Sequence, residues 1–398
     1  MPAKNDRLWT YSLPVALLLL APFNILASLG MDIYLPVVPM MPAILGTTPD
    51  IIQLTLSLYM IMLGVGQILF GALSDHIGRR PVLIGGVVLF AIASFGLAFS
   101  KSALLFVLLR LVQATGASAM LVAMFATIRD VYADKPESNS IYGLMNAMLA
   151  FVPAIGPVVG ALLVAQYGWP SVFIALAVPA LVLGVIVRPL WPETRDSASL
   201  TQRPDYRRLL RNRSFWSYTL GFGTAMGAFF VFFSIAPVLL VDKAGYSGLE
   251  FSFVFASVAL VMIGATKLVQ SHILLWGNRA SVVRGMALMA VGALLLTAGQ
   301  LFMRPSFWSF IVPMWVVAVG IVITASVTAN GALKDFGAMA GAAVALHFCI
   351  QSLIVGLVGT GAIMLFGHGK AWPLIAYIGV MASATLYAMD RLKEADTG

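Results

Sequence analysis

The sequence is poor in charged residues and has almost no cysteine. Only 10% of its 398 residues are Asp, Glu, Lys or Arg, whereas 60% are hydrophobic and the mean hydropathy is +0.95. A soluble protein has about 25% charged residues, so the composition excludes a water-soluble enzyme, a disordered chain and a nucleic-acid-binding domain. The one cysteine, Cys349, excludes an intramolecular disulfide framework and a cysteine-based zinc site.

Motifs for nucleotide binding and for common hydrolases are also missing. No G-x-x-x-x-G-K-[ST] phosphate loop occurs, so we do not expect ATP to be the direct energy source. The absence of H-E-x-x-H and of G-x-S-x-G weakens the hypothesis of a membrane enzyme. We therefore expect a protein that is not an enzyme and that has no cofactor and no metal.

Long apolar stretches make up most of the chain. A bilayer core about 30 Å thick needs about 20 apolar residues per helix, and twelve stretches meet this requirement. They do not alternate as the strands of a membrane barrel would, so the predicted fold class is an all-α membrane protein. The predicted spans are at residues 12–36, 51–73, 81–99, 102–127, 139–164, 170–190, 215–240, 250–275, 282–302, 307–331, 339–366 and 371–390.

Basic residues are distributed unevenly between the loops. An even number of spans puts both termini on one side, and with that side in the cytoplasm 18 of the 24 Lys and Arg are cytoplasmic. The positive-inside rule therefore predicts cytoplasmic termini. Scattering over several loops also argues against nucleic acid as a partner. Four basic residues fall in external loops and two within spans; these are Lys101, Lys243, Arg304 and Lys370, and Arg110 and Lys267.

The chain divides at its longest cytoplasmic loop. We predict an N-terminal six-helix half at residues 1–190, a linker at 191–214 and a C-terminal six-helix half at 215–398. Weak internal repetition at an offset of 199 residues agrees with a duplication. The repeated positions are Gly78, Arg80 and Gly86, which recur as Gly277, Arg279 and Gly285.

Residues 71–81, GALSDHIGRRP, join spans two and three. The segment resembles the cytoplasmic-loop motif of the major facilitator superfamily, G-x-L-x-D-R-x-G-R-R/K, with His76 where Arg is usual. The small Gly71 permits close helix packing, and Asp75 can pair with Arg79 or face the positive N-terminal end of span eleven near Gly337. The alternative is that these charges only set topology. The residues expected to act in gating here are Gly71, Asp75, Gly78, Arg79 and Arg80.

Two further segments resemble motifs of proton-coupled members of the superfamily. Residues 110–117, RLVQATGA, are similar to the fourth-span motif R-x-x-Q-G-x-G-A. A charge such as that of Arg110 inside a span is costly and usually functional; the alternative is a structural Arg tied to backbone carbonyls of span one. Residues 156–161, GPVVGA, resemble the antiporter motif G-P-x-x-G-G of span five. The expected conformational residues are Gln113, Gly156, Pro157 and Gly160.

Span one contains an isolated carboxylate. Fifteen of the 16 acidic residues fall in loops, tails or helix ends, and Asp32 alone falls inside a predicted span. Low dielectric penalises the charged form of a carboxylate, so that Asp32 could exchange a proton near neutral pH. The alternatives are an ionised Asp32 paired with Arg110, or one that caps a broken helix near Pro36. We expect Asp32 and Arg110 to carry proton coupling.

The resemblance extends over almost the whole chain. Span one is similar to the Bcr/CflA branch of twelve-span drug exporters, and several segments are similar to the chloramphenicol and florfenicol exporters. This resemblance implies proton-driven efflux of phenicol antibiotics across the bacterial inner membrane by alternating access, with a small-molecule drug, protons and the lipid bilayer as partners and a monomer as the expected state. The segments are residues 27–39, 52–59, 116–120, 230–237, 314–320, 327–333 and 371–373.

One position departs from the phenicol exporters, which typically have Asp after Pro-Phe in span one. Here that residue is Asn24, slightly over two helical turns before Asp32 and so on roughly the same face. Asn24 can hydrogen-bond a drug but cannot carry a proton. The predicted substrate-binding set follows from the resemblance and from helical facing; it is Asn24, Met31, Asp32, Tyr59, Met145, Asn146, Leu149, Phe230 and Phe233.

Three alternatives remain open at this point. The chain could be a broader multidrug antiporter, an importer of a small nutrient on the same fold, or a membrane sensor or enzyme without transport. The Gly156-Pro157 motif argues against an importer. The membrane carboxylate Asp32 and the duplicated halves argue against a protein that transports nothing.

Overall fold

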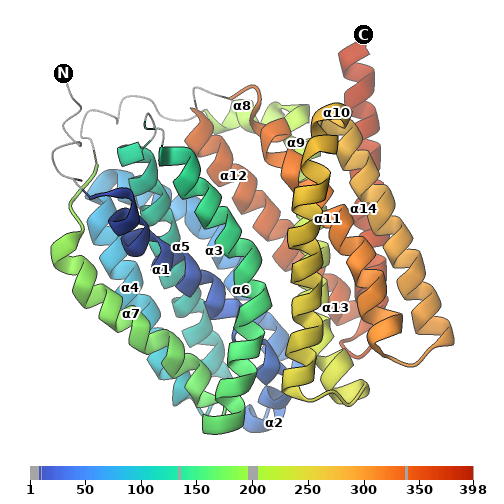
Figure 1. Cartoon of the computed structure of the whole chain (residues 1–398), viewed down its shortest axis with the longest axis horizontal. Coiled ribbons are helices and arrows are strands. Elements are labelled where there is room, and N and C mark those ends of the chain that lie inside the picture. The colour runs from blue at the N-terminus through green and yellow to red at the C-terminus, as the bar shows by residue number, and fades with distance from the viewer. Residues whose placement is uncertain are drawn as a thin grey trace.

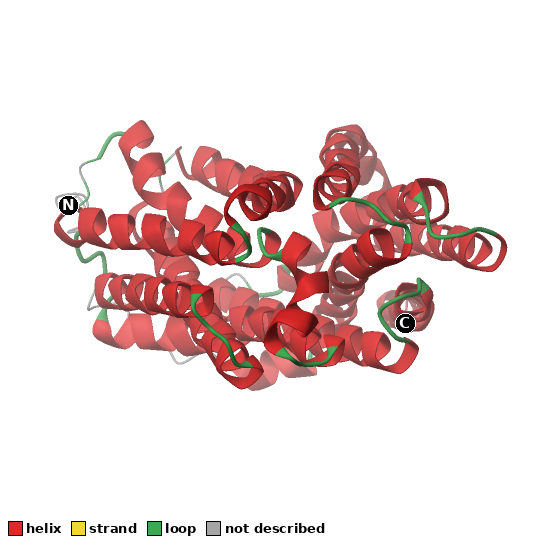
Figure 2. Cartoon of the chain, turned by 90° about the horizontal axis from the view of Figure 1, so that it is seen from below, coloured by secondary structure: helices red, strands yellow, loops and turns green. Residues whose placement is uncertain are grey.

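The computed structural model describes residues 9, 11–132, 135, 137–195, 205–336 and 339–397. Within this part of the chain the structure consists of helices joined by short loops, with no strand (Figure 2). The predicted all-α fold class is therefore confirmed for the described residues.

The helices before the linker form one group. They are α1 (Leu13–Asp32), η2 (Leu35–Met40), α2 (Met41–Leu45), α3 (Pro49–Ile77), α4 (Arg79–Ala98), α5 (Ala103–Tyr132), α6 (Glu137–Tyr167) and α7 (Pro170–Leu190). The helix α1 begins at the same end of the bundle at which the last helix ends (Figure 1). We call this end the terminal face and the opposite end, where α2 lies, the far face.

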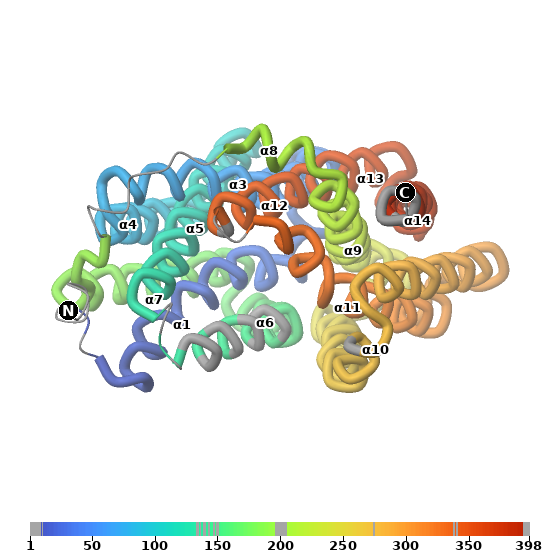
Figure 3. The backbone as a smooth tube through the Cα atoms, turned by 90° about the horizontal axis from the view of Figure 1, so that it is seen from above, coloured from blue at the N-terminus to red at the C-terminus, as the bar shows by residue number. Residues whose placement is uncertain are grey.

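The helices after the linker form a second group. They are α8 (Tyr206–Arg211), α9 (Arg213–Pro237), η4 (Val238–Lys243), α10 (Gly248–Phe302), η5 (Phe307–Ile311), α11 (Val312–Leu333), α12 (Ala340–Leu353), η7 (Ile354–Gly359), α13 (Thr360–Phe366) and α14 (Trp372–Thr397). The long α10 turns back at Gly277, whose φ of 74° is not helical, and so forms two spans. Seen from the terminal face, the two groups lie next to each other (Figure 3).

The spans agree in number and order with those predicted. By length and apolar composition, eleven helical stretches in the described ranges could each cross a membrane. The twelfth is α6, which has 31 residues, of which Phe151–Tyr167 form its apolar part. The predicted span boundaries differ from the helix ends by several residues, because helices such as α3 and α5 extend beyond their apolar cores.

Proline chemistry sets the end of α1. Pro36 has no backbone N–H, so it cannot donate the helical hydrogen bond to the carbonyl of Asp32, four residues earlier. The α-helix accordingly ends at Asp32 and continues as the 3₁₀ turn η2, in which the N–H of Val37 donates to the carbonyl of Tyr34 over 3.0 Å. Asp32 therefore lies at a break within the first span.

Candidate functional site

Asp32, the last residue of α1, is covered by α6. Its residue surface is 6% exposed, and it is the one buried Asp or Glu in the described part of the chain. A Cβ atom added at Gly156 of α6 would lie 2.7 Å from the Cβ of Asp32, and one added at Gly160 would overlap the carbonyl oxygen of Ile33. The two glycines of the predicted antiporter motif therefore allow α6 to pack directly on the turn that holds the carboxylate.

No ion pair and no hydrogen bond engages the Asp32 carboxylate within the described ranges. The alternative in which Asp32 pairs permanently with Arg110 is therefore not the arrangement in this structure. A buried carboxylate without a partner carries an uncompensated cost of desolvation when it is charged. This arrangement is suited to a group that takes up and releases a proton.

Arg110 is fully buried and contacts α1 from α5. Its Nη1 donates to the carbonyl oxygen of Gly30 over 2.7 Å and to Oε1 of Gln113 over 2.6 Å. Its guanidinium lies between two aromatic rings, 4.9 Å from the centroid of Tyr34 and 4.8 Å from that of Tyr59. Cation–π contact of this kind offsets part of the cost of burying the charge. Its Nε and Nη2 have no hydrogen-bond partner.

A chain of polar contacts extends from Arg110 into α4. Nε2 of Gln113 donates to Oγ of Ser94 over 2.7 Å, and Ser94 donates to the carbonyl of Phe90 over 2.6 Å. On the other side the hydroxyl of Tyr59 donates to the carbonyl of Ala27 over 2.7 Å. The structure thus brings together five predicted residues on α1, α3, α5 and α6; they are Asp32, Tyr59, Arg110, Gln113 and Gly156.

Asn24 lies elsewhere on α1 and already has a protein partner. Its Nδ2 donates to the backbone carbonyl of Met145 on α6 over 3.0 Å, and the residue is 1% exposed. Its Oδ1 is buried and has no hydrogen-bond partner. In this conformation the Asn24 amide, which was expected to hydrogen-bond a drug, instead connects α1 with α6.

The other predicted binding residues are dispersed and buried. Met31 and Met145 pack in the N-terminal group, whereas Phe230 and Phe233 belong to α9. The ring of Phe233 lies 5.9 Å from that of Phe255 in an aromatic cluster. The side chains of Asn146 and Leu149 lie outside the described residues.

Sequence reasoning missed Tyr34 as a partner of Arg110. Tyr34 lies two positions after Asp32, within the segment that resembles drug exporters, but no role was assigned to it. The signal that could have found it is the proline at position 36, because a proline there predicts that the helix ends shortly before Tyr34. In the described part of the chain no three His, Cys, Asp or Glu side chains gather to hold a metal.

The predicted gating segment forms an ionic cluster at the terminal face. Nη1 of Arg79 lies 2.5 Å from Oδ1 of Asp75, as expected, and Nε lies 2.8 Å from Oδ2 of Asp130. The carboxylate of Glu193 accepts hydrogen bonds from the backbone N–H groups of Arg79 and Arg80, over 2.8 Å and 3.1 Å. Asp130 and Glu193 were not predicted. The start of span eleven near Gly337, the other expected partner of Asp75, lies outside the described residues.

Two glycines of this segment behave differently. Gly78 has a φ of 107°, and a Cβ there would overlap the Glu193 carboxylate, so its lack of a side chain permits both the turn and the cap. The close packing expected at Gly71 is not found within the described ranges, because a Cβ at that position would meet none of their atoms within 4 Å.

Polar contacts between the two groups of helices lie away from the terminal face. Nε2 of Gln53 donates to Oγ of Ser234 over 3.1 Å, and Ser57 contacts Thr360. Ser252 of α10 donates to the carbonyl of Pro157 over 2.9 Å, and His368 lies 3.7 Å from Asp50. These four contacts connect helices of the first group with helices of the second. Together they hold the groups in contact in the half of the bundle that ends at the far face.

Comparison with known proteins agrees with this architecture. The chain is 45% identical over 387 residues to a chloramphenicol resistance protein of Pseudomonas aeruginosa, with 97% of this chain and 92% of that protein covered. It is 27% identical over 377 residues to the multidrug resistance protein MdtL of Shewanella sp. (strain ANA-3), with 92% and 93% covered.

Solved structures show the same fold at low identity. A D-xylose–proton symporter matches with a TM-score of 0.75 at 16% identity, covering 95% of this chain and 97% of that one. A peptide transporter solved with sulfate matches with a TM-score of 0.76 at 12% identity, covering 96% and 94%.

The sequence model of the Major Facilitator Superfamily matches residues 20–360, which include most of the described spans. The predicted class of multi-pass membrane transporter, rather than enzyme, is thereby confirmed. With eleven apolar spans and α6 in the described ranges, a family model matched over residues 20–360 and a relative of 45% identity, this chain belongs to the Major Facilitator Superfamily.

Proposed function

We propose that this transporter exports phenicol antibiotics, such as chloramphenicol and florfenicol, in exchange for protons. The relative of 45% identity is named for chloramphenicol resistance, and the observation that supports proton exchange is the buried, unpaired carboxylate of Asp32. We place the protein in the bacterial inner membrane as a monomer, with the terminal face and both termini in the cytoplasm. The moving bodies are residues 1–190 and 215–398, joined by the linker 191–214.

Exchange would proceed by alternating access of one site to the two sides. Drug enters from the cytoplasm or the inner leaflet while Asp32 releases its proton, and the opened outward side releases drug and reloads the carboxylate. A ligand drives such a cycle only through different affinities for the two states. For a neutral phenicol the membrane potential also contributes, by about 2.3 kcal/mol per charge per 100 mV.

Arg110 would act beside Asp32 rather than as its ion-pair partner. By holding the Gly30 carbonyl it fixes the turn on which the carboxylate sits, and its charge lies in the same low-dielectric region. Gln113 and the motif glycines of α6 support this geometry. We propose Asn24, Met31, Tyr59, Met145, Asn146, Leu149, Phe230 and Phe233 as residues that contact drug when the helices separate.

A broader multidrug antiporter is the second candidate, because relatives at 27% identity are named multidrug resistance proteins. The two functions differ in how resistance extends to cations. Minimum inhibitory concentrations of chloramphenicol, florfenicol and a cationic dye in a pump-deficient host would separate them. Resistance to the phenicols alone supports the first candidate, whereas resistance to the dye as well supports the second.

Transport itself is tested in proteoliposomes. Purified protein with an imposed proton gradient should accumulate labelled chloramphenicol and release protons in a drug-dependent manner. Protein that confers no resistance and moves neither drug nor protons would contradict the proposal and favour a membrane sensor. Increased drug accumulation in cells that express the protein would instead favour an importer.

A further inference from the structure

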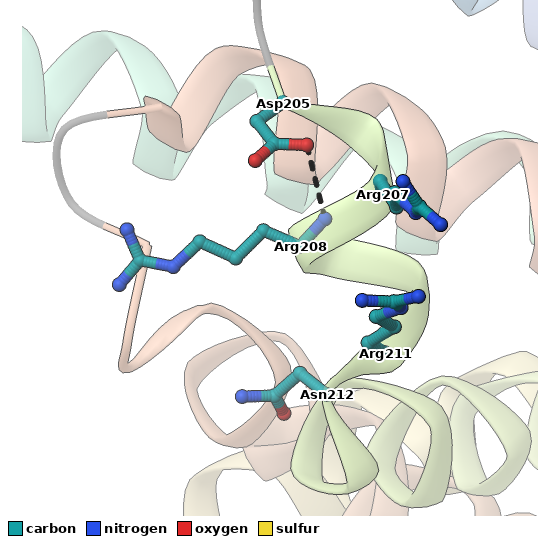
Figure 4. Close-up of a pocket in the computed structure, with 5 residues that line it drawn as sticks. All are labelled: Asp205, Arg207, Arg208, Arg211 and Asn212. Atoms are coloured by element: carbon teal, nitrogen blue, oxygen red, sulfur yellow. Dashed lines mark hydrogen bonds between the residues drawn. The ribbon is translucent and has the colours of Figure 1, made fainter.

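The short linker helix α8 carries an arginine-lined recess at the terminal face. Three arginines, together with Asp205 and Asn212, line a recess of about 400 Å³ (Figure 4). The side chains of Arg207 and Arg211 lie next to each other on one side of α8, and that of Arg208 extends from the other side (Figure 4). The recess therefore has three guanidinium groups and one carboxylate.

Among the described residues, neighbouring side chains offset the positive charge of this recess only in part. None of Arg207, Arg208 and Arg211 has an ion-pair partner among the residues that the structure describes. The Asp205 carboxylate caps α8 instead, because it accepts a hydrogen bond of 3.2 Å from the backbone N–H of Arg208. The net charge of the recess leaves it open to an anion.

Neighbouring exposed apolar groups indicate that the recess lies near the lipid head groups. Leu210 of α8 is 45% exposed, and Trp216, in the first turn of the span α9, is 42% exposed. The indole Nε1 of Trp216 donates to the carbonyl of Leu210 over 2.8 Å. An exposed tryptophan with a satisfied polar edge at the start of a span is typical of the membrane interface.

The helix α8 lies at the rim of the bundle rather than over its centre (Figure 3). It is held there by the second group of helices. Leu209 is buried, the Arg208 guanidinium lies 6.0 Å from the ring centroid of Phe336, and Nδ2 of Asn212 donates to Asp335 over 3.2 Å. These contacts leave Arg207 and Arg211 exposed at the terminal face.

We propose that this recess binds the phosphate of an anionic phospholipid. A guanidinium group donates two parallel hydrogen bonds to phosphate oxygens and is weakly hydrated, so two adjacent arginines suit a phosphate better than a point charge would. Basic clusters next to a span attract anionic lipid by about 1 kcal/mol per residue. The bound lipid ties the linker helix to the membrane beside α9 and α12. This site is independent of the drug pathway proposed above.

The test measures lipid binding directly and without transport. Purified protein is titrated with phosphatidylglycerol or with phosphatidylcholine, and bound lipid is counted by native mass spectrometry. The variant Arg207→Gln/Arg211→Gln is compared with Arg188→Gln/Arg213→Gln, which removes the same charge from exposed positions at the same face outside the recess. We expect phosphatidylglycerol to bind the wild type and the control equally. We expect it to bind the recess variant more weakly, by a factor of about ten or more.

A conservative variant distinguishes the effect of donor geometry from that of charge, and it is less disruptive to folding than the loss of both charges. Arg207→Lys/Arg211→Lys keeps both charges but loses the planar donor groups, so it should bind more weakly than wild type and more tightly than the Gln variant. Equal loss in the control variant would overturn the proposal in favour of a general surface charge. Equal binding of phosphatidylcholine would overturn it as well. Complete displacement by millimolar glycerol phosphate would assign the recess to a soluble phosphate instead of a lipid.

Discussion

Arg110 of α5 donates a 2.7 Å hydrogen bond to the backbone carbonyl of Gly30, two residues before Asp32. The acceptor is a main-chain group, so the arginine controls the path of α1 rather than the charge of the carboxylate. Because the same guanidinium lies between the rings of Tyr34 and Tyr59, its orientation is fixed on both sides. The geometry of the donor therefore matters as much as its charge.

The first prediction concerns this geometry. Arg110→Lys keeps a positive charge but loses the planar group that lies between the rings of Tyr34 and Tyr59 and from which Nη1 reaches Gly30 and Gln113. Loss of a hydrogen bond to a charged group costs about 1.5–3 kcal/mol, so we expect Arg110→Lys to lose nearly as much efflux as Arg110→Ala. The measurement is phenicol resistance at matched expression. Full resistance with Lys would show that a point charge suffices.

The second prediction concerns the packing of α6 on Asp32. Gly156→Ala would place a methyl group 2.7 Å from the Asp32 Cβ, so either the helices separate or the carboxylate moves. Overpacking of this kind costs about 1–3 kcal/mol. We expect a lower thermal unfolding midpoint and a marked loss of efflux. The matched control is Gly85→Ala in α4, where an added Cβ meets no atom within 4 Å; similar losses in both variants would contradict the argument.

The spans could be predicted from sequence, whereas most partners of the site could not. Apolar length and loop charge are local properties, so they show directly in the sequence. Asp75, a partner of Arg79, is only four residues away, but two other partners, Asp130 and Glu193, are 51 and 114 residues away, and no local pattern brings these together with Arg79. That Arg110 contacts the Gly30 carbonyl and not the Asp32 carboxylate is likewise set by the three-dimensional packing of α5 against α1.

The third prediction concerns Glu193, which caps α4. Its carboxylate accepts hydrogen bonds from the backbone N–H groups of Arg79, Arg80 and Arg195, over 2.8, 3.1 and 3.0 Å. Glu193→Gln retains one acceptor oxygen but loses the negative charge at a helix N-terminus, which is worth about 0.3–1 kcal/mol before hydrogen bonding is counted. We expect a lower unfolding midpoint and reduced efflux.

The control for this variant is Glu137→Gln at the start of α6. This variant also removes one negative charge at the terminal face, but Glu137 does not cap the N-terminus of α4. Because Glu137 lies in the first turn of α6, an unfolding midpoint that falls equally in both variants would assign the effect to the loss of a negative charge at a helix N-terminus and not to the hydrogen bonds of Glu193.

The fourth prediction concerns pH at the far face. His368 lies 3.7 Å from Asp50 of the other group of helices, and Lys243 lies nearby against Gly369. Burial is the larger cause and lowers the pKa of His368 below its ordinary value of 6.5, while the Asp50 carboxylate raises it. A group with a lower pKa in the closed form binds its proton more tightly once opening hydrates it. Closure of the far face is therefore fully stabilised above about pH 6.5 and weakens as the pH falls below it.

Spin labels at the exposed far-face positions Ile44 and Leu249 measure this opening as a distance. We expect the distance distribution to shift toward longer values on acidification. His368→Gln should remove that pH dependence, and Asp50→Asn should enlarge it, because the carboxylate opposes the effect of burial. A pH response that is unchanged in His368→Gln would assign it to another group.

The last prediction concerns Asp32 together with Asn24. Asp32→Asn removes the one buried acid of the described chain, so drug-dependent proton release should disappear, while binding of a neutral phenicol to solubilised protein survives. Asn24→Asp behaves differently, because Nδ2 of Asn24 donates to the Met145 carbonyl. A carboxylate there would face that oxygen without a proton to donate, whereas a carboxylic acid would restore the hydrogen bond.

The carboxyl group introduced by Asn24→Asp should therefore be held protonated while α6 packs on α1, and should ionise when the helices separate. We expect the variant to unfold at a lower temperature as the pH rises, to release more protons per drug than wild type, and to extend resistance to cationic drugs. Drug-dependent proton release at pH 7 from the wild type and both variants is the decisive measurement. Release that persists unchanged in Asp32→Asn would exclude Asp32 as the proton carrier and direct attention to His347, which is buried on α12 with Nε2 unpaired.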